Sequence, residues 1–237
     1  TVTRLGPEHF YVLSAAVAQL HDKDQLEWRR LATEKVTITD VTDDFGVLVL
    51  AGPLAREVLS KCTATDLSNT SFRWLTGKEA EVAGVKKVRL LRVNYVGELG
   101  WELHVPMADM PKVFDALTKA GKPYGLKLFG TYAMNSLRME KSYRGWGSEL
   151  TTEIDMFEAS MERFIRLEKP EFTGKAATLS MHQRGARMKL VPLEVANTDS
   201  DCVGNEPVYS GDRIVGLTTS GGYGHAVRKS LAFAYVD

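Results

Sequence analysis

A tyrosine and a glutamate stand near opposite ends of the glycine-rich stretch YVGELGWEL, residues 95–103. An aromatic ring can stack on a flat heterocycle, and a carboxylate can accept two N–H donors from its edge through short, charge-assisted hydrogen bonds. A pterin or a guanine presents such a donor pair. Tyr95 and Glu102 are therefore candidates for the wall of a heterocycle site. The structural alternative is a hairpin in which the ring shields an exposed carboxylate.

The spacing within this stretch predicts which side chains share a face. If residues 98–99 form a two-residue hairpin loop closed by Gly97 and Gly100, Tyr95 faces Glu102 on the paired strand. Facing residues of an antiparallel pair project from the same side of the sheet. The hypothesis therefore places Tyr95 beside Glu102, and leaves Glu98 as a turn residue, provided that no bulge shifts the register.

Three further patterns carry possible chemistry and have simpler structural interpretations. Arg138, in a helix expected over 131–142, could bind a carboxylate with two parallel hydrogen bonds, or form an intrahelical ion pair, or be solvated. Glu140 and Arg144 are four residues apart, which favours an ion pair on a helix surface. The stretch SGGYGH at 220–225 resembles a phosphate loop only superficially, because no helix is expected after it, and a β-turn is the favoured interpretation.

Composition excludes several classes of function. Of 237 residues, 44% are hydrophobic and 25% are charged, with 30 basic and 30 acidic side chains, so no net charge favours nucleic acid or an anionic membrane. No apolar run is long enough to span a bilayer. The five histidines and two cysteines lack metal-ligand spacing, and we expect no metal. So few, distant cysteines suit a reducing compartment: the cytoplasm in bacteria or the mitochondrial matrix in eukaryotes.

The predicted elements describe an α+β region followed by a smaller all-β region. The sequence pattern changes after residue 183, so we expect domains at 1–183 and 184–237. We expect both domains to be incomplete, because strand-like runs at each end suggest a piece of a longer polypeptide. The predicted helices cover 22–32, 54–61, 110–119 and 131–142. The predicted strands cover 1–5, 10–14, 35–40, 45–50, 85–95, 101–105, 188–195, 206–209, 213–219 and 230–236.

Several motifs, taken together and in order, resemble one family. They are YVGELGWEL, FGTYAMNSLRMEKSYRGWGSEL, FEASMERFIRLEK with FTGKAA, and VGLTTSGGYGHAVRKSLAFAYV. This set resembles the aminomethyltransferase (glycine-cleavage T-protein) family, and its wording is most similar to the folate-binding C-terminal region of the dimethylglycine dehydrogenase and sarcosine dehydrogenase branch. The resemblance implies an α+β folate-binding fold with a ferredoxin-like portion, followed by a small C-terminal β-barrel.

The resemblance also implies roles for individual residues. Tyr95 and Glu102 fall on the family's pterin-contacting pair, and Arg138 falls on its folate-contacting arginine. Trp146 matches an aromatic position of the folate site, and Trp74 is a weaker match for another part of its wall. The acid that assists attack by the folate amine is expected upstream of Thr1, so no catalytic residue is assigned within this chain.

The implied activity belongs to a larger flavoenzyme. FAD, bound by a preceding region, would oxidise an N-methyl amine and pass electrons to a further acceptor, and tetrahydrofolate bound here would capture the one-carbon unit as methylenetetrahydrofolate. Positioning of the two reactants would supply much of the rate. Two alternatives remain: a non-catalytic regulatory paralogue, as in the pyruvate dehydrogenase phosphatase regulatory subunit, and a stand-alone aminomethyltransferase of glycine cleavage.

Overall fold

A computed structural model describes residues 1–196 and 199–237 and divides them into two compact units. Unit 1 comprises Thr1–Asn94 and Glu98–Leu128, and unit 2 comprises Tyr95–Gly97 and Phe129–Asp237. The segment Tyr95–Gly97 thus groups with unit 2, although the chain on both sides of it belongs to unit 1. The two units are defined by compactness alone, so the domain boundary expected after residue 183 stays a prediction.

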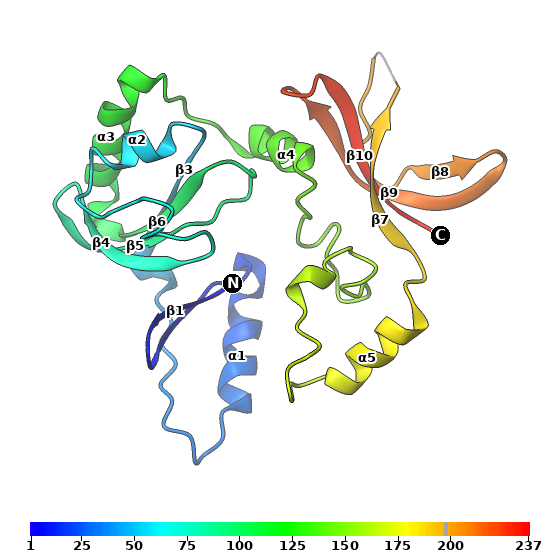
Figure 1. The fold of residues 1–237 in the computed structure, drawn as a ribbon, viewed down its shortest axis with the longest axis horizontal. Helices are drawn as coiled ribbons and strands as arrows, with labels where there is room; N and C mark the ends of the chain where they lie inside the picture. Colours follow the sequence, from blue (N-terminus) through cyan, green and yellow to red (C-terminus); the bar gives the residue numbers. More distant parts are fainter. Residues whose placement is uncertain (197–198) are drawn as a thin grey trace. The chain divides into compact units, whose positions relative to one another are not determined.

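Unit 1 is built on a four-stranded antiparallel sheet (Figure 1). Its strand order is β3-β6-β5-β4, with bounds β3 Phe45–Ala51, β4 Gly77–Val82, β5 Val85–Leu91 and β6 Gly100–Pro106. Alternate residues of β6 (Trp101, Leu103 and Val105) are fully buried, because they face α2 (Ala55–Leu59) and α3 (Met110–Gly121). These helices and one face of the sheet enclose the core of unit 1.

A hairpin at the N-terminus packs on the opposite side of this sheet. Strands β1 (Val2–Gly6) and β2 (His9–Val12) pair antiparallel as a hairpin, and they lie within two residues of the strands predicted at 1–5 and 10–14. Tyr11 of β2 contacts side chains of β3 and β6. The helix expected at 22–32 begins earlier, as α1 (Gln19–Arg29), and none of its side chains is buried.

The strand predicted at 35–40 is wrong. These residues are neither helix nor strand, although their side chains alternate in polarity. Asp40 instead accepts hydrogen bonds from the backbone and hydroxyl of Thr42, at 3.0 and 2.7 Å. Alternation produces a strand only where a neighbouring strand supplies the backbone partners, and β-propensity alone does not supply them.

Unit 2 combines two helices with a second antiparallel sheet (Figure 1). The helices are α4 (Thr131–Glu140) and α5 (Lys175–Arg184), and the strand order is β7-β10-β9-β8. The strands are β7 Lys189–Val195, β8 Pro207–Ser210, β9 Arg213–Gly224 and β10 Lys229–Val236. Met139 of α4 packs with Leu190, Phe233 and Tyr235 to form the core. Short 3-10 helices lie at Ala16–Ala18, Thr42–Asp44, Met107–Asp109, Lys122–Tyr124 and Glu162–Phe164.

Two sequence interpretations in unit 2 are wrong. The stretch SGGYGH is not a turn, because residues 220–224 extend β9 and pair with β10, and the turn follows at 225–228. Glu140 and Arg144 do not form a helix-surface pair, because α4 ends at Glu140. The Glu140 carboxylate accepts from the Ala226 backbone N–H at 2.8 Å, and Arg144 donates to the carbonyl oxygen of Ala159 at 3.0 Å.

Candidate functional site

Strand β6 places Glu102 on the side of the sheet opposite the core. Residues 101, 103 and 105 point to the core, so Glu102 and His104 project from the other side, which we call the Glu102 face. The Glu102 side chain is 23% exposed, whereas that of His104 is 2% exposed. Glu102 is therefore a partly exposed carboxylate beside a buried histidine on this face.

The neighbouring strands surround this carboxylate with apolar side chains. On β3, Val49 faces Glu102 and Val47 faces His104, and both valines are about half exposed. On β5, Leu91 faces Glu102 and is buried. Exposed valines beside an accessible carboxylate form an apolar surface with one charged acceptor, which is the composition expected of a small-molecule site.

A hydrogen bond from His104 holds the Glu102 carboxylate, and a second hydrogen bond joins His104 to the N-terminal hairpin. Its Oε2 lies 3.3 Å from Nε2 of His104, and Nδ1 of His104 lies 3.1 Å from the hydroxyl of Tyr11. The rings of Tyr11 and His104 meet edge to face, with centroids 5.4 Å apart. The contacts between Tyr11 and His104 thereby join the hairpin to β6 next to Glu102.

The predicted register of this region is wrong. Leu91, not Tyr95, faces Glu102, because the strands stop at Leu91 and Gly100 and leave a loop of residues 92–99 between them. Two contacts replace the expected tight turn: Asn94 donates through Nδ2 to the Glu98 carbonyl at 2.7 Å, and the Gly52 N–H donates to the Leu99 carbonyl at 2.8 Å. Tyr95 therefore does not share a β-sheet face with Glu102.

Tyr95 instead makes its contacts within unit 2. Its hydroxyl donates to the carbonyl oxygen of Arg144 at 2.7 Å, and its ring centroid lies 6.4 Å from that of Tyr143. Burial raises the pKa of Tyr95, the positive charge of Arg138 opposes this effect, and the negative charge of Glu149 adds to it. Tyr95 remains a protonated donor that fixes the loop after α4.

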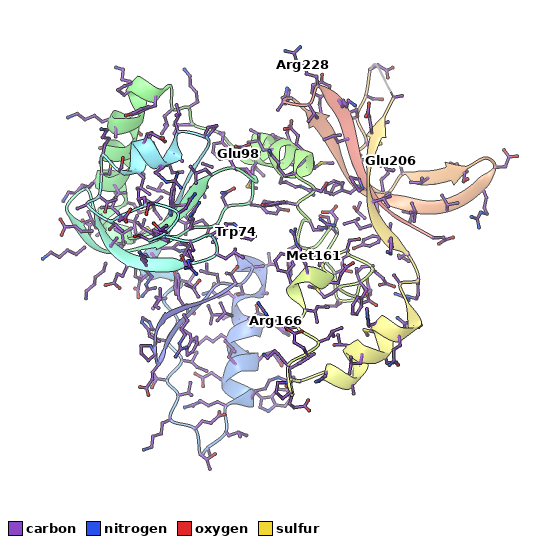
Figure 2. The ribbon with its side chains drawn as sticks, in the orientation of Figure 1. Trp74, Glu98, Met161, Arg166, Glu206 and Arg228 are labelled. Atoms are coloured by element: carbon purple, nitrogen blue, oxygen red, sulfur yellow. The ribbon has the colours of Figure 1, made fainter. Side chains whose placement is uncertain are left out.

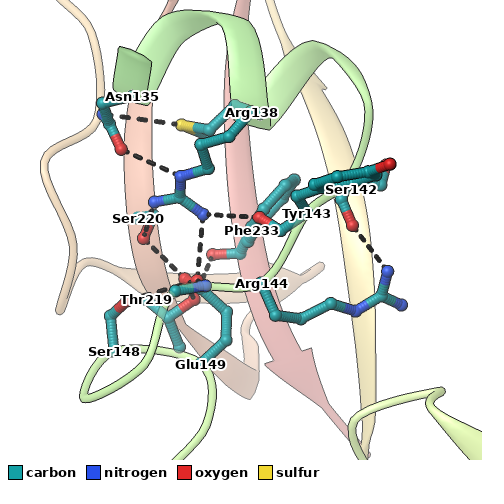
Figure 3. A network of polar contacts seen from close by, with 12 residues as sticks. Asn135, Arg138, Ser142, Tyr143, Arg144, Ser148, Glu149, Thr219, Ser220 and Phe233 are labelled. Atoms are coloured by element: carbon teal, nitrogen blue, oxygen red, sulfur yellow. Dashed lines mark hydrogen bonds and ion pairs between the residues drawn. The ribbon is translucent and has the colours of Figure 1, made fainter. Parts of the chain in front are cut away.

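Arg138 lies at the centre of a buried polar network in unit 2 (Figure 3). Its guanidinium donates to Asn135 Oδ1 at 2.9 Å, the Tyr143 carbonyl at 3.1 Å, Glu149 Oε2 at 2.9 Å and Ser220 Oγ at 2.8 Å. The side chain is therefore not solvated, and its ion pair with Glu149 is not within its own helix. An arginine has five N–H donors, so these four bonds leave at most one for a ligand.

Glu149 is the partner that the sequence analysis missed. This fully buried carboxylate accepts from Arg138, the Gly145 N–H at 2.5 Å, Ser148 at 3.2 Å, Thr219 at 2.6 Å and Ser220 at 2.5 Å. Burial acts to raise its pKa, but the hydroxyl and N–H donors and the charge of Arg138 outweigh burial and lower it. The only signal in the sequence was an acid in RGWGSEL, between glycines and a leucine.

Two family models together match most of the chain. The GCVT N-terminal domain matches residues 1–169, and the glycine cleavage T-protein C-terminal barrel domain matches residues 188–237. The chain belongs to the glycine cleavage T-protein family. The resemblance inferred from its motifs is confirmed.

Individual T-protein relatives match the chain along its whole length. Mitochondrial dimethylglycine dehydrogenase of Homo sapiens is 42% identical over 241 residues, which cover 100% of this chain and 27% of that protein. The aminomethyltransferase of Saccharopolyspora erythraea is 34% identical over 238 residues, covering 100% of this chain and 64% of that enzyme. The chain thus spans about a quarter of the length of the dehydrogenase.

A solved T-protein shares the fold. The glycine cleavage system aminomethyltransferase T from Bartonella henselae superposes with a TM-score of 0.84 at 24% identity, covering 99% of this chain and 62% of that chain. The predicted α+β fold with a small C-terminal sheet is confirmed, and the sheet lies where the family model places its barrel.

The remaining predicted residues of this T-protein chain lie in loops. Trp74, in unit 1, lies in the loop that precedes β4 (Figure 2), and Trp146, in unit 2, lies between α4 and the buried Glu149. Both indoles are exposed. Each indole therefore has surface that a ligand could reach.

Two kinds of feature are absent from residues 1–196 and 199–237. No three histidine, cysteine, aspartate or glutamate side chains in this part of the chain are grouped as a metal site. No described helix has the length and apolar character required to cross a bilayer.

Proposed function

We propose that this chain is the tetrahydrofolate-binding region of an FAD-dependent enzyme of the dimethylglycine dehydrogenase type. The activity would transfer the one-carbon unit of an oxidised N-methyl amine to tetrahydrofolate, giving methylenetetrahydrofolate. The observation that carries the proposal is the Glu102 face, where an accessible carboxylate stands beside two exposed valines. When bound, tetrahydrofolate supplies the secondary amine that accepts the one-carbon unit.

Glu102 is the residue that would recognise the pterin. A pterin edge offers two adjacent N–H donors, and an ionised carboxylate can accept both in a fork of charge-assisted hydrogen bonds. Within the described residues, only His104 donates to the Glu102 carboxylate, so acceptor positions remain for a ligand. Val47 and Val49 would cover part of the heterocycle and exclude water from the fork.

The other proposed contacts differ in what they can offer. Trp74 and Trp146 present free indole faces for stacking. The hydroxyl of Tyr95 already donates to a backbone carbonyl, which leaves its ring and its oxygen lone pairs for folate. Arg138 would contact folate through at most one N–H, because a bidentate contact would require it to release one of its four partners.

Binding by a Glu102→Ala variant tests the proposal. We expect the 237-residue chain to bind tetrahydrofolate saturably, and the variant to bind about tenfold more weakly or worse, because a buried hydrogen bond to a charged group contributes about 1.5–3 kcal/mol. Anaerobic titration calorimetry measures both affinities. Glu57→Gln, which removes an exposed acid from α2 of the same unit, is the matched control and should bind like wild type. Equal affinity of the Glu102 variant and wild type would refute the site.

A second candidate function rests on the match to an aminomethyltransferase over the whole chain. Such an enzyme would take the one-carbon unit from an aminomethyl group carried on a lipoyl thiol. The two candidates share the folate site and differ in the donor. Incubation of the chain with tetrahydrofolate and an aminomethylated lipoyl protein distinguishes them, since only the second function releases ammonia from that donor.

A further inference from the structure

A continuous chain of hydrogen bonds leads from the N-terminal hairpin to the Glu102 carboxylate. Tyr11 lies on β2, and His104 and Glu102 lie two residues apart on β6. The Tyr11 hydroxyl is 3.1 Å from Nδ1 of His104, and Nε2 of His104 is 3.3 Å from Oε2 of Glu102. All three residues belong to unit 1, so the arrangement is internal to one compact body.

The chemistry of the three groups determines the direction of each bond. An ionised carboxylate can only accept, so Nε2 of His104 must carry the proton that is shared with Glu102. In a neutral imidazole the other nitrogen then accepts, and the Tyr11 hydroxyl donates to it. The orientation of each donor follows from its neighbour, as in sites where a second group selects the tautomer of a histidine.

Packing holds the imidazole in place. His104 is 2% exposed, and its ring and that of Tyr11 meet edge to face. The guanidinium of Arg89, which faces His104 across β5 and β6, lies 4.3 Å from the centroid of Tyr11 and 4.1 Å from that of Phe45. These contacts of Arg89 with both rings hold Tyr11, which in turn holds His104.

We propose that His104 is a positioning residue for Glu102, with its tautomer set by Tyr11. The inference rests on the proposed function, because its purpose is to aim the carboxylate at the N–H pair of a pterin. The bond to His104 occupies one acceptor position on Oε2, and Oε1 accepts from no group among the described residues. Glu102 is thus held through Oε2, while Oε1 and the remaining acceptor position of Oε2 stay available for the two N–H donors of the ligand.

The physical advantage is preorganisation. A free glutamate side chain loses rotamer entropy when it binds, and a fixed one has lost it already on folding. Fixing the plane of the carboxylate also matters for a forked contact, because both N–H donors must meet lone pairs in one geometry. His104 should therefore contribute more to binding of the ligand's N–H donor pair than to binding of the rest of the ligand.

Three variants and two ligands test the assignment. The ligands are tetrahydrofolate and its 2-desamino analogue, which lacks one donor of the pair. His104→Phe keeps a ring but removes the bond to Glu102. His104→Gln restores a donor N–H at about the place of Nε2, and Tyr11→Phe removes only the hydroxyl. Calorimetric titration of each full-length chain gives the affinities, and the thermal midpoint reports whether each variant is folded.

We expect wild type to prefer tetrahydrofolate over the analogue by about tenfold or more, the factor that about 1.4 kcal/mol produces. His104→Phe should weaken tetrahydrofolate binding about tenfold and analogue binding less than about twofold, so that the preference disappears. His104→Gln should retain affinity within about threefold of wild type, and Tyr11→Phe should fall between the two. A His104→Phe variant that weakens both ligands equally, or neither, overturns the assignment, since a merely structural histidine would not act on one donor pair.

A measurement on the wild-type chain tests the same inference without substitution. A long-range ¹H–¹⁵N NMR spectrum distinguishes the tautomers of a neutral imidazole. We expect His104 to carry its proton on Nε2, and a proton on Nδ1 would overturn the inference even if no variant folds. The proposed function fails separately: if wild type does not bind tetrahydrofolate, both ideas fall, whereas loss of binding in Glu102→Ala with no effect of His104→Phe removes only the role of His104.

Discussion

Glu149 and Glu102 show how the surroundings of one residue type separate structure from recognition. Glu149 is fully buried and accepts from five donors, including Arg138. Glu102 is partly exposed and accepts from His104 alone among the described residues. A saturated carboxylate has no capacity for a ligand, and an unsaturated one at a solvent edge does. The first therefore holds unit 2 together, and the second is the candidate binding group.

The buried pair leads to a prediction about stability. Glu149→Gln should destabilise the chain by about 3–5 kcal/mol, because it leaves the Arg138 charge buried without its counter-ion. Urea denaturation followed by circular dichroism measures the change. Glu168→Gln, at a side chain that is 71% exposed, is the matched control and should change stability by less than about 0.5 kcal/mol. A Glu149 variant as stable as its control would contradict the role of the pair.

The loop between β5 and β6 determines the geometry of the Glu102 face. Two glycines in this region serve different needs: Gly97, in the loop, has a φ of 70°, which glycine adopts without strain, whereas Gly100, the first residue of β6, lies against the backbone of β3. A Cβ at Gly100 would lie 2.5 Å from the Leu50 carbonyl oxygen and 3.0 Å from the Cα of Ala51. Gly100 thus permits β6 to begin pairing with β3 two residues before Glu102.

Gly100→Ala should therefore separate the start of β6 from β3. We expect a loss of about 1–3 kcal/mol in the free energy of unfolding, as for other overpacked sites, together with weaker tetrahydrofolate binding. Chemical denaturation and calorimetry measure the two effects. Gly6→Ala is the control, because its new Cβ would lie 3.6 Å from the nearest atom, which is ordinary contact. Wild-type stability in the Gly100→Ala variant would mean that β3 can move away from the new Cβ without loss of stability, which would contradict the prediction.

The junction before β8 carries a pH-sensitive contact. The Glu206 carboxylate accepts from the hydroxyl of Thr218 on β9 and from the backbone N–H groups of Val203, at 2.8 Å, and Gly204, at 3.0 Å. These donors lower the pKa of Glu206 to about 2, chiefly through Thr218. The carboxylate thereby ties the loop before β8 to β9.

Stability from this contact should be lost in acid. A lowered pKa contributes stability that is fully present above the ordinary glutamate value of 4.5 and disappears as the pH falls through about 2. Glu206→Gln should therefore be less stable than wild type at pH 7, and the difference should shrink between pH 4.5 and 2. Thermal midpoints across this range measure it. A difference that is independent of pH would exclude ionisation of Glu206 as its source.

Over residues 1–196 and 199–237 the molecule has two separate hydrophobic cores, one in each unit. The larger surrounds Trp101 and Phe72 between the first sheet and its helices, and the smaller joins Met139 to Phe233 on the second sheet. Basic and acidic side chains balance at 30 each, so long-range charge does not attract an anionic ligand. We therefore expect the proposed affinity for folate to come from local contacts such as those of Glu102.

Ligand binding should be visible in the stability of the whole chain. Tetrahydrofolate at about 100 times its dissociation constant should add about 2.7 kcal/mol to the stability of the folded state. For a protein of this size that corresponds to a rise of about 5–10 °C in the thermal midpoint. Differential scanning fluorimetry measures the shift, and Glu102→Ala, which should bind about tenfold more weakly or worse, should reduce it to about half or less at the same concentration. A shift of equal size in the variant would place the ligand elsewhere.

Much of the fold could be read from periodicity and local chemistry. The N-terminal hairpin, β3, α3 with its early proline, and the strands of the second sheet lie within a few residues of their predicted positions. The motifs identified the family, and the alternation of side chains along β6 places Glu102 on the opposite side of the sheet from its buried neighbours. These features depend on residues close together in the sequence, where side-chain pattern and backbone geometry are directly coupled.

Contacts between distant residues could not be read in this way. The register of β5 against β6 depends on an eight-residue loop whose ends are held by Asn94 and by a hydrogen bond from Gly52. The pairing of Arg138 with Glu149, and of Tyr11 with His104, joins segments that no periodic pattern relates. Residue types and spacing therefore determined that this chain belongs to the T-protein family, and they predicted a glutamate suited to a heterocycle. Only the tertiary structure decided which groups surround that glutamate, because backbone hydrogen bonding and burial are satisfied across the fold and not along the chain.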